Sequence, residues 1–490
     1  MGMIGIDLGT TFCAVAALDD HGRPSPVPNR DGSLVTPSAV YFAPDGSAVV
    51  GQPALDFALK QPDRVATLIK RKMGLPDYGR PVAGREFRPE TLAAIILKKL
   101  AQDAATQFGP ITGCVITVPA SFDESRRKAT MDAGRIAGLN VIDIIDDTSA
   151  AALAYSLASP IAQTVLVYDL GGGTFDAILV KLGEKRCQVL AIEGDARLGG
   201  TDWDDRLASW AAERFHKEYG TNPRRDPQSE AMLQATVEQA KRTLSQAEQA
   251  NVTVNHAGKQ FTASITRAEF ETLTRDLLLR TQLATQQVLT QAKLTWAQVD
   301  QVLMVGGSTH MPAVQKMLAE LTGREPDHSL ALDGVLARGA ALHAGNASGD
   351  FTEINVNAHA MGVQVRQGVE QMNQQLVPRN TQLPASAEEM YYTSRDNQTR
   401  VRVRILQGEA KQADACTAVG ECWIEGLPAH LPKGAPVRLR CGVAANGRIE
   451  VAATDLTSGH ALRAAILYPS GLTDHDVNRE AIWVRNLRVV

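Results

Sequence analysis

Apolar and polar positions follow two different patterns along this chain of 490 residues. Up to about residue 345, short β-branched apolar runs alternate with stretches whose apolar positions recur at helical spacing. The segment "GCVITVPASF" (113–122) is typical of a strand that ends at a proline-marked loop, and "ESRRKATMDAGRIAGL" (124–139) is typical of a helix. This alternation predicts an α/β domain over residues 1–345.

A pattern with a period of two residues dominates the later part of the chain. The run "TRVRVRIL" (399–406) alternates strictly, and Asn446-Gly447 separates two further alternating runs, which is a strong hairpin signal. We therefore expect a β-sandwich or barrel-like domain over residues 358–472. The small and polar residues near 344–353 predict a linker, assigned to 346–357, and residues 473–490 have room for one short helix or strand.

Two segments about 160 residues apart are near copies of each other: "IGIDLGTTFCAVAAL" and "VYDLGGGTFDAIL". Each runs from an apolar strand into an Asp, then into a loop of glycines and threonines, and then into a second apolar strand. Glycines allow backbone N–H groups to converge on a phosphate. A carboxylate beside such a loop requires a cation, and Mg²⁺ is the usual one. The pair predicts two facing lobes with a magnesium nucleotide between them.

Two further segments fit a nucleotide site less specifically. The predicted helix 231–250 carries an apolar stripe and, opposite to it, a polar stripe that could hold a ribose and an adenine; a solvated helix face is the alternative. The segment "VLMVGGSTHMPAVQKML" (302–318) reads as strand, Gly-Gly turn and helix start. The polar stripe consists of Glu238, Lys241, Arg242 and Ser245.

Composition narrows the choice of partners and location. With 50 basic and 54 acidic residues the net charge is −4, so we expect neither nucleic acid nor a membrane surface as a partner. We see no basic leader before the first strand and no uninterrupted membrane-length apolar run, so we expect a cytoplasmic protein. The six cysteines are scattered, which favours buried thiols over metal ligands.

The motifs "GIDLGTT", "VITVPASF", "VYDLGGGTFD", "LGGTDWD", "QAKRTLS", "VGGSTHMP" and "DNQTRVRVRILQGE" together resemble the signature segments of the seventy-kilodalton heat-shock chaperones, the DnaK-type family. The resemblance spans residues 4 to about 475 in the same order. It implies an α/β actin-like (ribonuclease H-like, duplicated) ATPase domain followed by a β-sandwich that binds extended peptides. It also implies ATP or ADP with Mg²⁺ and K⁺, unfolded or extended peptide segments, a J-domain co-chaperone and a nucleotide exchange factor as partners, and a monomeric state.

The resemblance also assigns roles to individual residues. Asp7, Asp169 and Asp176 are expected to order the waters around Mg²⁺. The residues expected to act in hydrolysis are Lys70, Asp147, Asp169, Thr174 and Asp176. Those expected to hold the phosphates are Gly9, Thr10, Thr11, Gly171, Gly172 and Gly173. Those expected to close the pocket and hold adenosine are Gly199, Gly200, Thr201, Glu238, Lys241, Arg242, Ser245, Gly306, Gly307, Ser308, His310 and Asp333.

Three departures from the family pattern bear on nucleotide chemistry and on coupling. Asp147-Thr148 stands where the family has Glu-Pro, and one methylene less moves the carboxylate by roughly 1.5 Å. His310 replaces the adenine-stacking Arg. Phe351 and Ile354 are the only large apolar linker residues, so we expect weaker linker docking.

The resemblance gives further expectations for the second half. Residues 473–490 are too few for the family's helical lid, so we expect a short tail without one. Its apolar side chains would stay free or fold back onto the β domain. The peptide cleft is expected to be lined by Met361, Val363, Val365, Tyr391 and the loop near Val419, with Arg366 intruding.

Three classes of function remain. The first is an ATP-dependent chaperone that binds short extended peptides. The second is an actin-like ATPase that serves as a scaffold or regulator for one dedicated partner. The third, a sugar kinase, is disfavoured because a small-molecule kinase has no use for the β domain.

Overall fold

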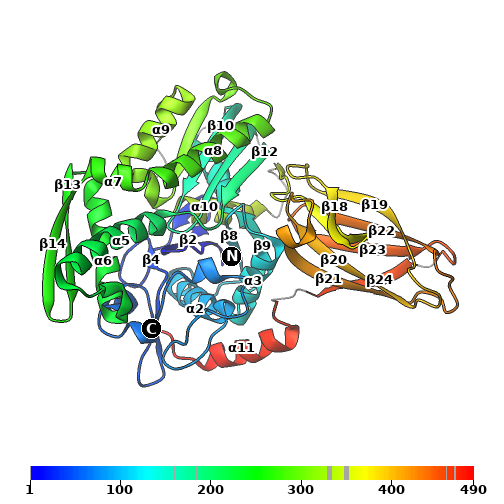
Figure 1. Cartoon of the computed structure of the whole chain (residues 1–490), viewed down its shortest axis with the longest axis horizontal. Coiled ribbons are helices and arrows are strands. Elements are labelled where there is room, and N and C mark those ends of the chain that lie inside the picture. Colours follow the sequence, from blue (N-terminus) through cyan, green and yellow to red (C-terminus); the bar gives the residue numbers. More distant parts are fainter. Residues whose placement is uncertain are drawn as a thin grey trace.

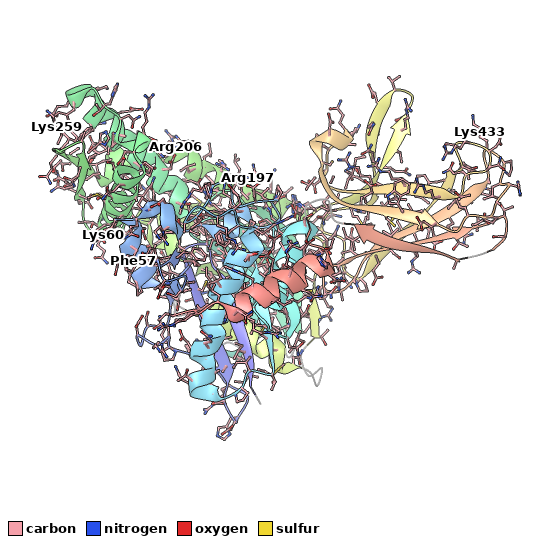
Figure 2. All side chains as sticks on the ribbon, turned by 90° about the horizontal axis from the view of Figure 1, so that it is seen from below. Phe57, Lys60, Arg197, Arg206, Lys259 and Lys433 are labelled. Atoms are coloured by element: carbon pink, nitrogen blue, oxygen red, sulfur yellow. The ribbon has the colours of Figure 1, made fainter. Side chains whose placement is uncertain are left out.

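The computed structural model describes residues 2–158, 161–183, 186–327, 334–346, 352–459, 461–467 and 471–490. An α/β body carries a β module that projects to one side (Figure 1). Lys259 and Lys433 lie at opposite ends of the molecule in Figure 2.

The part of the body called lobe I here is built on a sheet with the strand order β3-β2-β1-β8-β9, and β4 also pairs with β2. A small sheet, β6-β5-β7, lies in the same half. Its principal helices are α2 (Pro89–Phe108) and α3 (Glu124–Ile136), the second as predicted. The remaining elements are β1 (Met3–Asp7), β2 (Phe12–Leu18), β3 (Pro24–Pro26), β4 (Thr36–Pro37), β5 (Val40–Phe42), β6 (Ala48–Val50), α1 (Gln52–Ala58), β7 (Val65–Ala66), β8 (Gly113–Val118) and β9 (Val141–Asp146).

Lobe II is built on a sheet with the order β15-β10-β11-β12-β16. Helix α6 (Pro227–Leu244) ends six residues before the predicted position 250, because strand β13 already begins at Gln249. Its predicted apolar stripe is buried. The other elements are β10 (Gln163–Leu170), β11 (Phe175–Gly183), β12 (Arg186–Asp195), α5 (Gly200–Tyr219), β13 (Gln249–His256), β14 (Lys259–Thr266), α7 (Arg267–Leu273), α8 (Arg275–Gln291), β15 (Gln301–Val305), α9 (Pro312–Thr322) and β16 (Thr352–Ile354).

The two sheets share one pairing pattern. In lobe I, β1 pairs antiparallel with β2 and parallel with β8. In lobe II, β10 pairs antiparallel with β11 and parallel with β15. Both predicted strand-loop-strand hairpins are therefore present, with Asp7 at the end of β1 and Asp169 directly opposite Asp176.

Helices α4 (Asp147–Ala158) and α10 (Val335–Gly345) join the two lobes. Helix α10 packs on β1 and β2, α4 packs on β10 and β11, and the two helices contact each other. A Cβ on Gly339 would lie 1.8 Å from the carbonyl oxygen of Ala150, so this close crossing requires glycine. The crossing sets the position of one sheet relative to the other.

The β module contains eight strands in the order β18-β17-β20-β21-β24-β23-β22-β19, wrapped around one apolar core. The predicted hairpin is confirmed, since Gly447 lies between β22 and β23 with φ 80°. The strands are β17 (Met361–Gln367), β18 (Glu370–Val377), β19 (Ala385–Tyr392), β20 (Arg400–Gln407), β21 (Thr417–Glu425), β22 (Pro436–Val443), β23 (Ile449–Asp455) and β24 (Ala461–Leu467).

The predicted peptide-cleft residues do not lie in an open cleft. Met361, Val363 and Val419 are at most 2% exposed and belong to the core of the module. Tyr391 of β19 donates a hydrogen bond over 3.0 Å to Gln374 of β18, the strand at the opposite end of the strand order, and Arg366 is exposed. The predicted strands are therefore confirmed, but the predicted cleft is wrong for Met361, Val363 and Val419, because the inward face of the strands is a packed interior.

The C-terminal residues were expected to stay free or to fold onto the β domain, and the linker was expected to dock weakly. The structure differs in both places. Helix α11 (Asp474–Asn486) packs on α2 and α3 of lobe I and not on the β module (Figure 1). In the linker, Thr352–Ile354 form strand β16, which pairs parallel with β12 and becomes the edge of the lobe II sheet; Phe351 lies outside the described residues.

No helix in the described ranges is long and apolar enough to cross a membrane. All six cysteines are free thiols, and five of them are buried.

Candidate functional site

The two glycine loops lie against each other where the lobes meet. A Cβ on Gly172 would lie 2.5 Å from Cγ2 of Thr11, and a Cβ on Gly173 would lie 2.5 Å from Cγ2 of Thr10. Side chains at these two positions would push the loops apart, so the contact requires glycine. The sequence pattern predicts this facing arrangement.

Each loop is closed by its own hydrogen bonds. The amide of Gly171 donates to the carbonyl of Thr174 over 3.1 Å. The carbonyl of Gly9 accepts a hydrogen bond from Ser38 Oγ over 2.8 Å. These contacts stabilise the turn of each loop.

Three buried carboxylates, a fourth that is partly buried, and one buried lysine lie at the strand ends beside the loops. Asp7 ends β1, Asp169 and Asp176 face each other across the β10–β11 hairpin, and Asp147 begins α4. Lys70, in a 3₁₀ turn formed by Ile69–Lys72, places its Nζ 3.2 Å from Asp147 Oδ2. Both of these side chains are 5% exposed, so the ion pair is shielded from water.

The carboxylates of this cluster carry more negative charge than Lys70 can balance. Burial, followed by repulsion from Asp147, raises the pKa of Asp7 to about 7. Burial likewise raises the pKa of Asp176 to about 8 and that of Asp169 well above its usual value. Burial disfavours the charge of Lys70, but Asp147 and Asp7 outweigh it and raise the pKa of its ammonium group. Among the described residues Lys70 forms its ion pair with Asp147, and none is formed by Asp7, Asp169 or Asp176, so a further cation would be stabilised here.

The residues fit a hydrated divalent ion better than a directly ligated one. Among the described residues, no group of three or more His, Cys, Asp or Glu side chains is arranged to hold a metal directly. Asp147 Oδ1 is nevertheless buried without a hydrogen-bond partner among those residues. Mg²⁺ keeps several of its waters when it binds proteins, so carboxylates one water away suit it.

Two residues that sequence reasoning did not select hold the carboxylates in place. Thr117 Oγ1 donates to Asp7 Oδ1 over 3.3 Å, and the amide of Ser121 donates to Asp176 Oδ1 over 3.0 Å. Both lie in the "VITVPASF" segment. The parallel pairing of β8 with β1 brings this segment beside Asp7.

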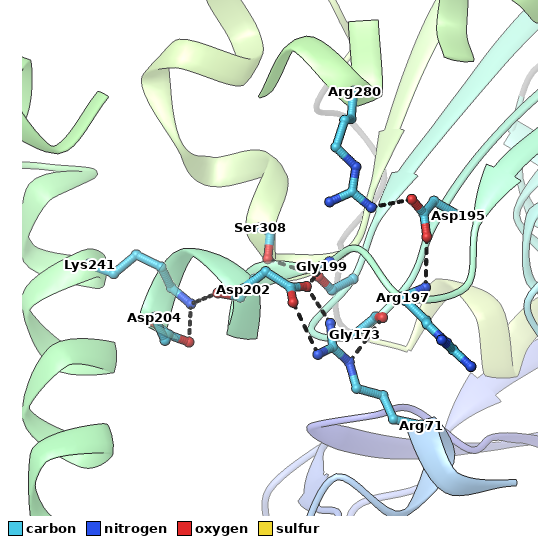
Figure 3. Close-up of polar contacts among 12 residues, drawn as sticks. Arg71, Gly173, Asp195, Arg197, Gly199, Asp202, Asp204, Lys241, Arg280 and Ser308 are labelled. Atoms are coloured by element: carbon cyan, nitrogen blue, oxygen red, sulfur yellow. Dashed lines mark hydrogen bonds and ion pairs between the residues drawn. The ribbon is translucent and has the colours of Figure 1, made fainter. Parts of the chain in front are cut away.

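Sequence reasoning also missed Arg71, which links the two lobes beside the glycine loop of lobe II (Figure 3). It forms a two-point ion pair with Asp202 of α5, and its Nε donates to the carbonyl of Gly173 over 3.2 Å. The only sequence signal was its place in the basic run beside Lys70.

The start of α5 supports the lobe II loop. The amides of Gly200 and Thr201 donate to the carbonyls of Gly171 and Gly172 over 2.9 and 2.8 Å. Ser308 Oγ donates to the carbonyl of Gly171 over 2.9 Å. A Cβ on Gly199 would lie 2.4 Å from the amide nitrogen of Gly173, so the packing is tight. These predicted pocket residues brace the loop.

The predicted adenosine-binding residues on α6 divide into two groups. Lys241 and Ser245 line a pocket together with Trp203, Leu244 and Met311. Lys241 Nζ also lies 2.7 Å from Asp204 Oδ2 and donates to the carbonyl of Gly200 over 3.0 Å.

The other group is more exposed. Arg242 pairs with Glu238 over 2.6 Å, and its guanidinium lies 5.7 Å from the ring centre of Phe12 in lobe I. Gly306, with φ 85°, and Gly307 precede the exposed His310. Asp333 lies outside the described residues.

The comparison with known protein families agrees with these motifs. The family described as "Hsp70 protein" matches residues 3–80 and 77–482, which is nearly the whole chain. The match includes both glycine loops, the aspartate cluster and the β module. The chain therefore belongs to the Hsp70 family.

Proposed function

We propose that this chain is an ATP-hydrolysing molecular chaperone that binds extended peptide segments. The observation that carries the proposal is the cluster of Asp7, the buried Asp147, Asp169 and Asp176, and the buried Lys70, where two glycine loops meet. Such a cluster beside loops suited to phosphate calls for a cation and a polyanion together. Membership of the Hsp70 family supports the same activity.

We also infer that the two lobes are the halves of a duplicated, actin-like fold. The shared pairing of β1 with β2 and β8, and of β10 with β11 and β15, supports this. Duplication would explain why the two phosphate loops are near copies in sequence.

The proposed mechanism assigns a positioning role to each polar group. When bound, Mg²⁺ would neutralise phosphate charge, and Asp7, Asp169 and Asp176 would hold it through its waters. Lys70, kept charged by Asp147, would place its ammonium toward the terminal phosphate and the attacking water. Thr10, Thr11, Thr174 and the glycine amides would hold the phosphate oxygens.

The short side chain of Asp147 sets the expected rate. Its Oδ2 is committed to Lys70, whereas its Oδ1 has no partner among the described residues. A glutamate would carry the carboxylate roughly 1.5 Å farther toward the nucleotide. We infer that basal hydrolysis is slow for this reason.

The β module would bind the peptide, and a J-domain co-chaperone and a nucleotide exchange factor would act on the ATPase part. We infer a cytoplasmic monomer with neither nucleic acid nor a membrane surface as partner. The net charge of −4 supports the absence of polyanionic partners.

One observation favours a second candidate, a scaffold or regulator with one dedicated partner. Met361, Val363 and Val419 are packed in the core of the β module and are not free to bind a peptide. A library of unrelated apolar heptapeptides tests the two alternatives. Binding of many members would support the chaperone, and binding of none would support the dedicated scaffold.

Nucleotide binding itself is tested by titrating the full chain with Mg·ATP. Asp7→Asn and Asp176→Asn should each weaken binding of Mg·ATP relative to ATP with EDTA, whereas the exposed control Asp31→Asn should not. Equal affinities in all four proteins would show that the site is elsewhere.

A further inference from the structure

Residues 471–490, called the α11 segment here, are built into lobe I. Leu472, Val477 and Val484 are at most 4% exposed. They share one apolar cluster with Leu92 and Ile96 of α2 and with lobe I strand residues. Figure 1 shows α11 along the lower side of the body, and in Figure 2, seen from below, the helix crosses the near face of the body. The segment thus contributes to the interior of lobe I.

Polar contacts complete the attachment at both ends of the helix. Lys98 Nζ of α2 donates to the carbonyls of Val484, Arg485 and Leu487 over 2.7, 3.1 and 2.9 Å. These carbonyls lie at or just beyond the C-terminal end of α11, where carbonyls lack the regular helical partner, and a cation favours that end. Near its start, Lys128 Nζ of α3 donates to the carbonyl of Leu472 over 3.1 Å.

An aromatic contact and a strand pairing extend the interface beyond the helix. The ring centre of Trp483 lies 5.8 Å from that of Phe87, and the guanidinium of Arg85 lies 4.0 Å from the Trp483 ring centre. The amide of Ala48 in β6 donates to the carbonyl of Arg488 over 2.9 Å, and its carbonyl accepts from the amide of Val490 over 2.9 Å. The segment therefore forms a parallel β-bridge, between Val489 and Ala48, at the edge of the small sheet of lobe I.

The β module is connected to the body at two places, called its roots here. The C-terminal root is the α11 segment, and the N-terminal root is attached to a different part of the body. Strand β16 pairs with β12 of lobe II, Arg379 forms an ion pair with Glu193 over 2.7 Å, and the amide of Ile192 donates to Asn380 over 3.0 Å. This N-terminal root also contacts lobe I, because Asn355 Nδ2 donates to Asp146 Oδ2 over 2.9 Å and His359 Nε2 lies 2.9 Å from the carbonyl oxygen of Ser121. The C-terminal root, formed by the α11 segment, lies on lobe I. All the contacts of the α11 segment described above lie within lobe I, so a change in the angle between the lobes leaves them intact.

We propose that the α11 segment is a permanent part of lobe I, so that the β module is an insertion held at both ends and stays on the body whichever nucleotide is bound. The proposal rests on the proposed function only in supposing that nucleotide binds between the lobes. A consequence follows for peptide exchange. Release of the module from the body is then not the step by which ATP acts, and any effect of ATP passes through small movements at the two roots or at the contact between Gln407 of β20 and the amide of Glu124 in α3.

Hydrogen exchange of the full chain without nucleotide, with ADP and with a non-hydrolysable ATP analogue tests this directly. The amides of α11 should be protected in all three states, with rates that differ by less than threefold. A threefold or larger acceleration in any nucleotide state would overturn the proposal. Rapid exchange in the nucleotide-free protein would also overturn it. Nucleotide binding is measured separately, so a failure to bind counts against the proposed function alone.

A pair of matched variants separates a structural part from a loosely docked one. Val484→Ala removes buried methyl groups, whereas Ile482→Ala changes a side chain that is 60% exposed on the same helix. Val484→Ala should accelerate exchange in α2 and α3 at least tenfold, and Ile482→Ala should not. Unchanged protection of α2 and α3 in Val484→Ala would contradict the inference.

A reversible cross-link supplies a test that does not depend on stability. Ala48→Cys combined with Val489→Cys places two thiols at the bridge between β6 and the α11 segment. Oxidation should leave nucleotide affinity and peptide release unchanged relative to the reduced protein and to either single variant. Loss of an ATP effect on oxidation, restored by reduction, would show that undocking belongs to the cycle and would overturn the proposal.

Discussion

A buried carboxyl on α2 gives a quantitative prediction. Glu90 is 1% exposed, and its Oε2 has no hydrogen-bond partner among the described residues. Burial raises its pKa to about 7, with Arg88 and Lys128 lowering it and Asp132 raising it to smaller extents. At pH values between 4.5 and about 7, the folded protein holds a proton on Glu90 that the unfolded chain, with a pKa of 4.5, has largely lost.

The sign and size of the effect follow from this difference. Between pH 4.5 and 7 the folded state binds more protons than the unfolded state, so stability falls as the pH rises and is then constant. A shift of two to three pKa units corresponds to about 3 kcal/mol. Glu90→Gln carries no charge and should therefore be more stable than the wild type at pH 8 by up to about 3 kcal/mol, with little difference near pH 5.

Urea unfolding at pH 5 and pH 8 measures this gain. Glu86→Gln is the matched control, because Glu86 is exposed and close in sequence. The control should change stability by less than about 0.5 kcal/mol at both values of pH. A loss of stability in Glu90→Gln at pH 8, or a gain equal at both values of pH, would refute the reasoning.

Three further predictions concern the nucleotide site. Asp147→Glu should raise the single-turnover rate of ATP hydrolysis, and equal rates would show that this acid has no positioning role. Arg71→Ala removes an ion pair between the lobes and should speed nucleotide release up to about fivefold in stopped flow, unlike Lys72→Ala; equal rates would exclude a gating role. Asp7 and Asp176 have pKa values of about 7 and 8 in the free protein, and a bound cation lowers them, so binding of Mg·ATP should release protons at pH 7 and none at pH 9.5. Calorimetry in two buffers measures the release, and finding none at pH 7 would contradict this prediction.

The sequence predicted features that depend on short stretches of chain. The two hairpins, with Asp7 and Asp169 at the ends of their first strands, follow from local alternation and from glycines, which allow the tight turn between the strands. The hairpin at Gly447 follows for the same reason. Helix α3 and the buried stripe of α6 follow from helical periodicity. In each case the signal and the structure lie within about twenty residues.

The features that sequence reasoning missed depend on distant partners. The pair of Arg71 and Asp202 joins residues 131 positions apart, and no local pattern selects one partner over another. The apolar stripe of α11 indicates that the helix docks, but not that Lys98 and Phe87 of lobe I receive it. Alternation around Val363 indicates an inward face, but it cannot distinguish a packed interior from an open cleft.

The central claim is that the buried aspartates position a metal for hydrolysis of ATP between the lobes. Single-turnover hydrolysis of Mg·ATP by the full chain, compared with Asp176→Asn, tests it most directly. Loss of a charge that holds the metal waters should cost more than about 1.4 kcal/mol of transition-state stabilisation, so the rate should fall at least tenfold. Hydrolysis at the same metal-dependent rate in both proteins, or no hydrolysis by the wild type, would contradict the account.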